Sequence, residues 1–334
     1  MGAISVGIVG VGRMGRLYAD FLSHGIPGAR LTAISGSTGR DLAEALDIAY
    51  YENHMALLKS KNIEMVLVCT RTPSHAELAI AAAQEGKHIF LEKPIALRVE
   101  DADQVIEEAH KNRILLTIGF MRRFDPSYRS VRHQIVQGAL GMPLSIRGVH
   151  RSKLPPDWVL RADEGGGLAL DYLVHEYDLA RWLLESEVER VYAVGGALVY
   201  REKLNSMPGL MDQVAVLMQM KSGATASVEA CCAAEYAYDV RTEVLGSKGM
   251  ATIGSLGKDY VTTYMTGKGS VSSTNLSSGN RFREAFRLQL EEFVSCVSDN
   301  RQPLVTGEDG RAALCIGLAV ARSLHEGKPV EVML

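Results

Sequence analysis

The chain has 334 residues, and at about 150 residues per domain this length suggests two domains. Hydrophobic residues make up 47% and charged residues 22%, as in an ordinary globular protein, which excludes an intrinsically disordered chain. The 36 Lys and Arg residues against 39 Asp and Glu residues give a net charge of -3. Such a balance supplies no positive field to gather nucleic acid or an anionic membrane, so we expect neither as a partner.

The apolar runs of the chain are short. The stretch 114–121 ends at Arg122, well below the roughly 18 apolar residues that a membrane span needs. Residues 4–9 already have the pattern of a strand, which leaves no cleavable secretion signal ahead of them. We therefore expect a cytoplasmic protein.

The cysteines are odd in number and lack the C-x-x-C spacing that is typical of zinc sites. Their neighbours are mostly apolar, so we interpret them as reduced and mostly buried thiols, and we expect no metal site. They are Cys69, Cys231, Cys232, Cys296 and Cys315.

The first third of the chain alternates short apolar runs with segments of helical periodicity. The runs predict strands over 6–9, 31–35, 65–70, 88–92 and 114–119, and the segments between them predict helices over 13–24, 40–46, 74–85 and 99–112. Alternation of this kind is typical of a parallel sheet with helices on both faces. We therefore expect an α/β, doubly wound parallel sheet of the Rossmann type.

One of these helices has a predicted start. Ser74 and Glu77 have the spacing of a capping box, in which the serine accepts from a first-turn amide and the glutamate returns to the N-cap amide. Pro73 is expected to stop any earlier extension of the helix.

The pattern changes near Gly119. Strand-like stretches at 144–150, 191–200, 213–220, 224–230 and 239–245 follow one another with few helices between them, which predicts a largely antiparallel open sheet in a C-terminal α+β domain. Helices are predicted at 171–184, 281–298 and 308–325, and the Gly- and Ser-rich stretch 266–280 is expected to be an exposed, mobile connection. We expect a first domain over 1–120 and a second over 121–334, whose C-terminal helix is a segment able to pack back on the first domain.

A G-x-G-x-x-G motif lies directly after the first predicted strand, from Gly10 through Gly12 to Gly15, with Arg13 and Met14 inside it. In that position glycines permit a tight turn, a close approach of the backbone to a pyrophosphate, and close packing of helix on strand. The amides at the helix N-terminus attract the anion. We interpret the motif as a dinucleotide-binding turn; the alternative is a glycine turn without a ligand.

NAD-selective sites usually carry an acidic residue at the end of the second strand. The chain has no carboxylate there until Asp41 and instead offers Ser37, Thr38 and Arg40. Hydroxyl donors and a guanidinium suit the 2′-phosphate of NADP, so we predict that NADP is used at least comparably to NAD. The alternative, that Arg40 merely opens the next helix as a solvated charge, stays open.

Two further groups of polar residues suggest chemistry. Glu92-Lys93-Pro94 follows a predicted parallel strand, at the edge where open α/β sheets bind ligands, although a Lys beside an acid is more often a surface pair. After Gly165-Gly166-Gly167, Asp171 and His175 stand four residues apart, which places both on one face of a helix. A lone His is more often structural, and the Asp/His pair is better evidence of a site.

Together, the glycine motif, Thr72-Pro73 before a capped helix, Glu92-Lys93-Pro94 and the Asp-x-x-x-His helix resemble the Gfo/Idh/MocA oxidoreductase family over essentially the whole chain. Within the family, Gly119 to Asp125, Asp171 to Glu176 and Tyr236 to Asp239 resemble the inositol 2-dehydrogenases most closely. In two places the chain departs from them, since Ser152 stands where they often have Asn and Glu235 where a basic residue is common.

The resemblance implies a catalytic group and two binding groups. The residues implied to be catalytic are Lys93, Asp171 and His175. The resemblance also implies a cis peptide bond at Pro94, which would direct Lys93 into the active-site cleft. The residues implied to line a polyol pocket are Lys93, Arg123, His150, Ser152, Asp171, Tyr172, His175 and Tyr236. With the positions argued above, the candidates for cofactor contact are Gly10, Gly12, Arg13, Met14, Gly15, Ser37, Thr38, Arg40, Thr70, Thr72, Pro73, His75, Glu92 and Lys93.

These residue types suit the oxidation of a secondary alcohol. A neutral His removes the hydroxyl proton as hydride leaves carbon, Asp171 orients the imidazole, and Lys93 stabilises the developing alkoxide. We expect an NAD(P)-dependent dehydrogenase of a cyclitol such as myo- or scyllo-inositol. The alternatives are the same chemistry on a pyranose sugar, and a non-catalytic regulator that senses NAD(P).

The later strands also bear on assembly. The stretches 214–218 and 230–234 place apolar residues on both sides of a pleat of which helices are expected to cover one, and an open apolar face is a liability in a monomer. Family resemblance points to a homodimer or homotetramer built there.

Overall fold

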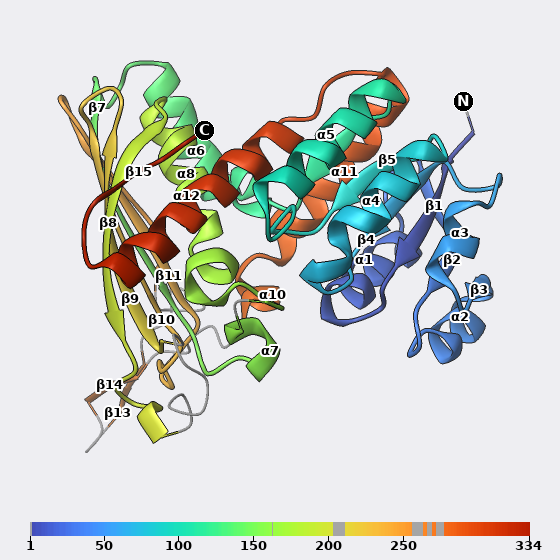
Figure 1. The fold of residues 1–334 in the computed structure, drawn as a ribbon, viewed down its shortest axis with the longest axis horizontal. Helices are drawn as coiled ribbons and strands as arrows, with labels where there is room; N and C mark the ends of the chain where they lie inside the picture. Colours follow the sequence, from blue (N-terminus) through green and yellow to red (C-terminus); the bar gives the residue numbers. More distant parts are fainter. Residues whose placement is uncertain (1, 162, 203–210, 256–262, 266–268, 272–276) are drawn as a thin grey trace. The chain divides into compact units, whose positions relative to one another are not determined.

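The computed structural model describes residues 2–161, 163–202, 211–255, 263–265, 269–271 and 277–334 (Figure 1). It divides into two compact units. The first unit comprises Met1–Met121 and Phe286–Leu314, and the second comprises Arg122–Ala285 and Cys315–Leu334. The chain thus leaves the first unit and later returns to it. The expected division into domains over 1–120 and 121–334 stays a prediction.

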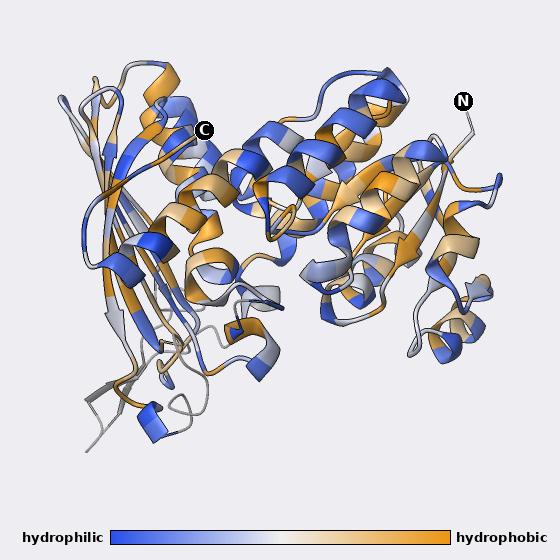
Figure 2. Ribbon diagram, in the orientation of Figure 1, coloured by the Kyte–Doolittle hydropathy of each residue, from blue (hydrophilic) through white to orange (hydrophobic). Residues whose placement is uncertain are grey.

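The first unit is built on a parallel sheet. Its strands are β1 (Ile4–Val9), β2 (Ala29–Ser35), β3 (Ala49–Tyr51), β4 (Met65–Val68), β5 (His88–Leu91) and β6 (Leu116–Ile118). They lie in the order β3-β2-β1-β4-β5-β6, and every neighbouring pair is parallel. The strand order reverses between β1 and β4, which with right-handed crossovers places helices on both faces. Figure 2 shows the central strands as mainly hydrophobic, and the predicted doubly wound fold is confirmed.

The helices of the first unit cover this sheet. Their bounds are α1 (Arg13–Ser23), α2 (Arg40–Leu46), α3 (His54–Leu58), the 3₁₀ turn η1 (Thr72–Ser74), α4 (His75–Gln84) and α5 (Val99–Lys111). The buried ring of Tyr18 on α1 packs edge-on against Phe90 of β5, with 5.1 Å between the ring centroids. Aromatic contacts of this kind contribute about 0.5–1.5 kcal/mol beyond the area that they bury.

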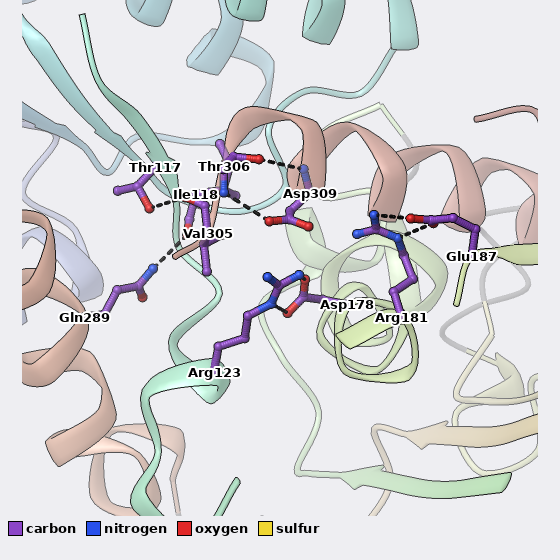
Figure 3. A network of polar contacts seen from close by, with 10 residues as sticks. All are labelled: Thr117, Ile118, Arg123, Asp178, Arg181, Glu187, Gln289, Val305, Thr306 and Asp309. Atoms are coloured by element: carbon purple, nitrogen blue, oxygen red, sulfur yellow. Dashed lines mark hydrogen bonds and ion pairs between the residues drawn. The ribbon is translucent and has the colours of Figure 1, made fainter. Parts of the chain in front are cut away.

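The returning segment carries most of α11 (Arg283–Asp299) and the first residues of α12 (Gly307–Glu326). It is tied to β6 by two buried hydrogen bonds, shown in Figure 3. The hydroxyl of Thr117 donates to the carbonyl oxygen of Val305 at 2.8 Å, and the amide of Gln289 donates to the carbonyl oxygen of Ile118 at 2.7 Å. A first domain ending at residue 120 would lack these partners.

The capping box predicted at Ser74 is wrong. The Ser74 hydroxyl lies 2.8 Å from the Thr70 hydroxyl and 2.9 Å from the Arg71 carbonyl oxygen, and makes no capping bond to a first-turn amide. The reason is that Ser74 has the helical backbone angles φ -97° and ψ -1°, whereas an N-cap residue that accepts from the first turn is normally extended. The α-helix α4 itself starts at His75, after Pro73, as predicted, and Pro73 lies within the 3₁₀ turn η1 that leads directly into it.

The second unit is built on a seven-stranded sheet. Its strands are β7 (Pro143–Arg151), β8 (Val188–Gly196), β9 (Gln213–Met220), β10 (Thr225–Cys231), β11 (Asp239–Gly246), β12 (Met250–Ile253) and β15 (Val330–Glu331). They lie in the order β12-β11-β7-β10-β9-β8-β15. Only β7 and β10 pair in parallel, so the predicted largely antiparallel sheet is confirmed.

The helical elements of this unit include several that the sequence analysis did not predict, of which α6 is the longest. They are η2 (Met121–Phe124), α6 (Pro126–Val136), α7 (Asp157–Leu160), the π-turn η3 (Leu168–Tyr172), α8 (Val174–Leu184) and α10 (Ser278–Arg281). The unpredicted α6 has a clear start signal, since Asp125 accepts from the amides of Ser127 and Tyr128, and Pro126 follows it.

The helix predicted over 171–184 begins earlier and in a different form. The chain enters it at Gly167, whose φ of 67° suits glycine, and first makes the π-turn η3. The amide of Leu173 donates to the carbonyl oxygen of Leu168 at 3.0 Å, five residues back, and α8 follows at Val174. The prediction of one continuous α-helix is therefore wrong.

The expected connection over 266–280 lies largely outside the described residues. Of this stretch the structure describes β14 (Gly269–Val271), which pairs with β13 (Thr263–Met265), and the residues from Ser277 onward.

None of the helices within the described ranges combines the length and the apolar character that a membrane span requires.

Candidate active site

The glycine motif of the first unit has the geometry of a dinucleotide turn. Gly10 has a φ of 91°, and a Cβ built on Gly15 would lie 2.0 Å from the carbonyl oxygen of Gly10, so neither position suits a larger residue. A Cβ on Gly12 would meet nothing within 4 Å, and no side chain caps the helix that starts after it. Space beside uncapped amides fits the pyrophosphate of a nicotinamide dinucleotide.

This difference between the two glycines gives a prediction. Gly12→Ala is expected to leave the unfolding temperature unchanged while lowering dinucleotide affinity by at least about tenfold, which corresponds to about 1.4 kcal/mol. Gly15→Ala is expected to lower the unfolding temperature itself, because its Cβ collides with backbone. Calorimetric unfolding and dinucleotide titration on both variants check this. Tight dinucleotide binding by Gly12→Ala would remove the turn from the site.

The edge after β2 carries the residues considered for a 2′-phosphate. Ser37, Thr38 and Arg40 are exposed, and the guanidinium carbon of Arg40 lies 4.8 Å from the centre of the Tyr50 ring. Arg16 donates to the carbonyl oxygen of Thr38 at 2.8 Å. The stacking on Tyr50 restrains Arg40 but leaves the edge of its guanidinium available for a phosphate.

The edge after β5 holds a buried carboxylate beside the candidate catalytic lysine. Glu92 accepts from the hydroxyl of Tyr18 at 2.8 Å and from the backbone amide of Lys93 at 3.2 Å. Burial raises the pKa of the Glu92 carboxyl, and the Tyr18 hydrogen bond and the charge of Lys93 oppose that rise. Lys93 is half-buried, and the peptide bond to Pro94 is cis, as predicted. Glu92 is thus enclosed by protein groups.

The remaining cofactor candidates lie after β4. Thr72 is buried, Pro73 is exposed, and Thr70 accepts from the Ser74 hydroxyl. His75 is 1% exposed, and both of its ring nitrogens lie against backbone carbonyl oxygens. A cavity of about 660 Å³ opens nearby; its lining residues are Glu52, Asn53, His54, Met55, Ser74, Glu77 and Leu78.

In the second unit, the structure separates Asp171 from His175 by a change of helix type. Asp171 is half-buried in the π-turn η3, and His175 is buried near the start of α8. The two residues do not share one continuous α-helix, and their expected pairing stays a prediction.

Asp178, one turn after His175, belongs to a buried ion pair. It receives two hydrogen bonds from Arg123, of 3.0 Å from Nε and 2.6 Å from Nη2. Figure 3 shows the two side chains facing each other. The Arg123 guanidinium also lies 5.8 Å from the centre of the Trp182 ring. Arg123 was expected to line a polyol pocket, which stays a prediction; in the structure it anchors α8 through Asp178.

A second buried network surrounds His150. Arg122 pairs with Glu176, and its other terminal nitrogen lies 3.2 Å from Nδ1 of His150. Nε2 of His150 lies 3.2 Å from the Tyr238 hydroxyl, and the carbonyl oxygen of Tyr172 lies 3.2 Å from Nδ1. Burial lowers the pKa of Arg122, but Glu176, Tyr128 and Tyr238 together offset this and leave the pKa raised.

The other predicted polyol residues differ in exposure. The hydroxyls of Ser152 and Tyr172 lie 2.8 Å apart, and burial raises the pKa of the Tyr172 hydroxyl, which keeps it protonated. Tyr236 is 49% exposed and donates to Asp239 at 2.7 Å.

Sequence reasoning missed three residues of these networks, Arg122, Glu176 and Tyr238. Each lies within two residues of a candidate residue in the sequence. For Tyr238 the available signal was its spacing of two residues from Tyr236, which in a strand places both side chains on one face. No group of His, Cys, Asp or Glu side chains in the described ranges has a metal-binding arrangement.

Comparison with known proteins decides the family. Residues 4–120 match the model of an oxidoreductase family with an NAD-binding Rossmann fold, and residues 128–252 match the GFO/IDH/MocA C-terminal domain. This chain belongs to the Gfo/Idh/MocA oxidoreductase family. The expected family is thereby confirmed, and the first unit is its NAD-binding fold.

Members of this family resemble the chain over nearly its full length. A scyllo-inositol 2-dehydrogenase (NAD(+)) of Bacillus subtilis is 33% identical over 97% of this chain and 95% of its own. A myo-inositol 2-dehydrogenase of Thermotoga maritima is 35% identical over 98% of both chains. The structure is similar to that of scyllo-inositol dehydrogenase from Lactobacillus casei with bound NAD(H) and scyllo-inositol, with a TM-score of 0.92, 29% identity and 99% of each chain covered.

Proposed function

We propose that this family member is an NAD(P)-dependent dehydrogenase that oxidises a secondary alcohol of an inositol-like cyclitol. The observation that carries the proposal is the presence of Lys93, Asp171 and His175 at the positions of the motifs, in a chain that matches inositol 2-dehydrogenases over nearly its whole length. The dinucleotide turn at Gly10 to Gly15 supports the cofactor class.

In the proposed mechanism the chain's own residues handle the proton and the charge. His175 removes the hydroxyl proton of the substrate, Asp171 orients its imidazole and stabilises the cation that forms, and Lys93 stabilises the developing alkoxide. Bound NAD(P) supplies the acceptor for the hydride. Ordered donors and acceptors around a polyol ring are proposed at Arg123, His150, Ser152, Tyr172 and Tyr236.

A steady-state screen tests this proposal. Purified protein is assayed with myo-inositol, scyllo-inositol and glucose, each with NAD and with NADP. Turnover of an inositol at the highest kcat/KM supports the cyclitol assignment, and a preference for glucose supports the pyranose alternative. Dinucleotide binding without turnover of any polyol would favour the non-catalytic, NAD(P)-sensing regulator.

Cofactor choice is a separate proposal. We propose that NADP is used at least comparably to NAD, because the chain lacks a carboxylate after β2 and offers Ser37, Thr38 and Arg40 there. A charge-assisted bond to phosphate contributes about 1.5–3 kcal/mol, so Arg40→Ala is expected to weaken NADP binding about ten- to a hundredfold and NAD binding much less. The matched control is Arg113→Ala. Arg113 is an exposed charge that precedes β6, at the amino ends of the strands and away from the residues after β2. Equal loss for both dinucleotides, or no loss, would contradict the proposal.

The open face of the sheet in the second unit supports the proposal of a homodimer or homotetramer. Tyr192, Val194 and Leu217 are 40%, 51% and 54% exposed and alternate with buried neighbours along β8 and β9. Exposed apolar side chains gathered on one face are typical of protein interfaces. Light scattering is expected to return a multiple of 36.3 kDa, and a monomer at micromolar concentration would contradict the proposal.

We also propose a cytoplasmic location. All five cysteines are free thiols in the structure, and reducing compartments are where thiols persist.

A further inference from the structure

His75 lies between two loops at the carboxyl edge of the parallel sheet. Its Nδ1 is 2.8 Å from the carbonyl oxygen of Pro94, and its Nε2 is 3.1 Å from the carbonyl oxygen of Thr70. Thr70 follows β4, and Pro94 follows Lys93 after β5. A carbonyl oxygen only accepts hydrogen bonds, so the imidazole must donate to at least one of the two loops.

The ring stands where the backbone ladder between these strands ends. The last paired residues of β4 and β5 are Val68 and Leu91, and the amide of Glu92 still donates to the carbonyl oxygen of Val68 at 3.0 Å. Pro94 has no N–H group with which to extend the ladder. Lys93 is therefore flanked by a ladder bond on one side, and on the other by the contact between Pro94 and His75.

The burial of His75 decides whether this residue contacts the dinucleotide directly or supports the backbone next to Lys93. The residue is 1% exposed, and both polar atoms of its ring face main-chain oxygens. Such a ring offers no polar atom to a dinucleotide. Burial lowers the pKa of His75, and the nearby charge of Lys93 lowers it further, while the two carbonyl contacts raise it.

We propose that His75 is a positioning residue, which acts on the proposed dehydrogenase reaction through Lys93. By binding the Pro94 carbonyl it fixes the backbone on the far side of the lysine, and by packing against Thr70 it ties that backbone to the neighbouring loop. This inference rests on the proposed function, since it takes its catalytic consequence from the role of Lys93.

Three variants test the proposal. His75→Phe fills a similar volume without any hydrogen bond, and His75→Gln retains one amide donor. The matched control is His88→Phe. His88 lies at the amino end of β5, the strand that Lys93 and Pro94 follow, and its Nδ1 accepts from the backbone amide of Leu115 at 3.0 Å. His88 thus makes a comparable backbone contact at the opposite end of β5.

For His75→Phe we expect kcat to fall about ten- to a hundredfold, the loss that a misplacement of about 1 Å produces, while the dinucleotide Kd changes less than about threefold. The deuterium isotope effect on kcat should increase, because the hydride step becomes rate-limiting. His75→Gln should be intermediate, and His88→Phe should retain wild-type values of both quantities.

Hydrogen exchange supplies a readout that does not depend on turnover. The amides of Ile95 and Ala96, which follow Pro94, should exchange faster in His75→Phe than in the wild type and in His88→Phe. If the wild type oxidises no polyol, the proposed function fails while this exchange still decides whether His75 holds the loop. Unchanged exchange and kcat in His75→Phe, an equal loss in His88→Phe, or a loss confined to dinucleotide affinity would overturn the inference.

Discussion

Replacing Lys93 or His175 by alanine is expected to lower turnover by about two to four orders of magnitude, the range that acid/base and electrostatic groups contribute. Dinucleotide affinity should stay close to that of the wild type, because neither change touches the turn from Gly10 to Gly15. Stopped-flow measurement of hydride transfer, together with dinucleotide titration on the same preparations, checks both halves of this expectation.

His110→Ala and Lys111→Ala are the matched controls, since both side chains are exposed near the end of α5. They remove the same residue types at exposed positions of the first unit and should leave turnover unchanged. Near-normal turnover in Lys93→Ala or in His175→Ala would remove that residue from the mechanism.

Arg122→Met is expected to destabilise the second unit by about 3–5 kcal/mol, the usual consequence of leaving a buried charge without its partner. Arg122 and Glu176 have side chains that are 1% and 2% exposed. Burial raises the pKa of the Glu176 carboxyl, and Arg122 opposes that rise. Removing Arg122 therefore raises this pKa further above its unfolded value.

The sign of the pH dependence follows from that direction. A carboxyl whose pKa is raised in the folded state binds its proton more tightly when folded. The loss of folding stability that it causes is therefore absent below the unfolded pKa and grows as pH rises towards the folded pKa. The stability difference between Arg122→Met and the wild type should be smaller near pH 5 than near pH 8. Chemical denaturation at both values measures it.

A double variant separates the broken pair from the loss of packing. Arg122→Met combined with Glu176→Leu replaces the ion pair by apolar side chains, a change that is often neutral, and should recover most of the lost stability. An equal loss in the single and double variants would show that the charge of Glu176 is not the cause.

Local sequence patterns predicted much of the fold. The helix over 40–46 and the strand over 213–220 have their predicted bounds, because period and flanking residues are encoded within each segment. The helix α6 was missed although its signal, Asp125 before Pro126, was present. The capping box failed because Ser74 continues a 3₁₀ turn, a backbone state that the motif does not specify.

The candidate residues were recognisable by type and position, but their partners were not. Arg123 bonds to Asp178, 55 residues later, and Tyr238 meets His150 from 88 residues away. Such pairs depend on the register of β7 and β11 and on where α8 lies against the sheet, which no local pattern encodes. The π-turn that holds Asp171 is likewise a backbone form that the spacing of Asp171 and His175 does not reveal.

The central claim is that this chain transfers a hydride from a cyclitol carbon directly to a nicotinamide, and an isotope measurement tests it most directly. Inositol carrying deuterium on its ring carbons is incubated with the protein and NAD or NADP, and the reduced dinucleotide is isolated and weighed by mass spectrometry. We predict that each reduced dinucleotide carries one deuterium, with a primary isotope effect on single-turnover reduction. Reduced dinucleotide without deuterium, or no reduction with any inositol, would contradict the claim.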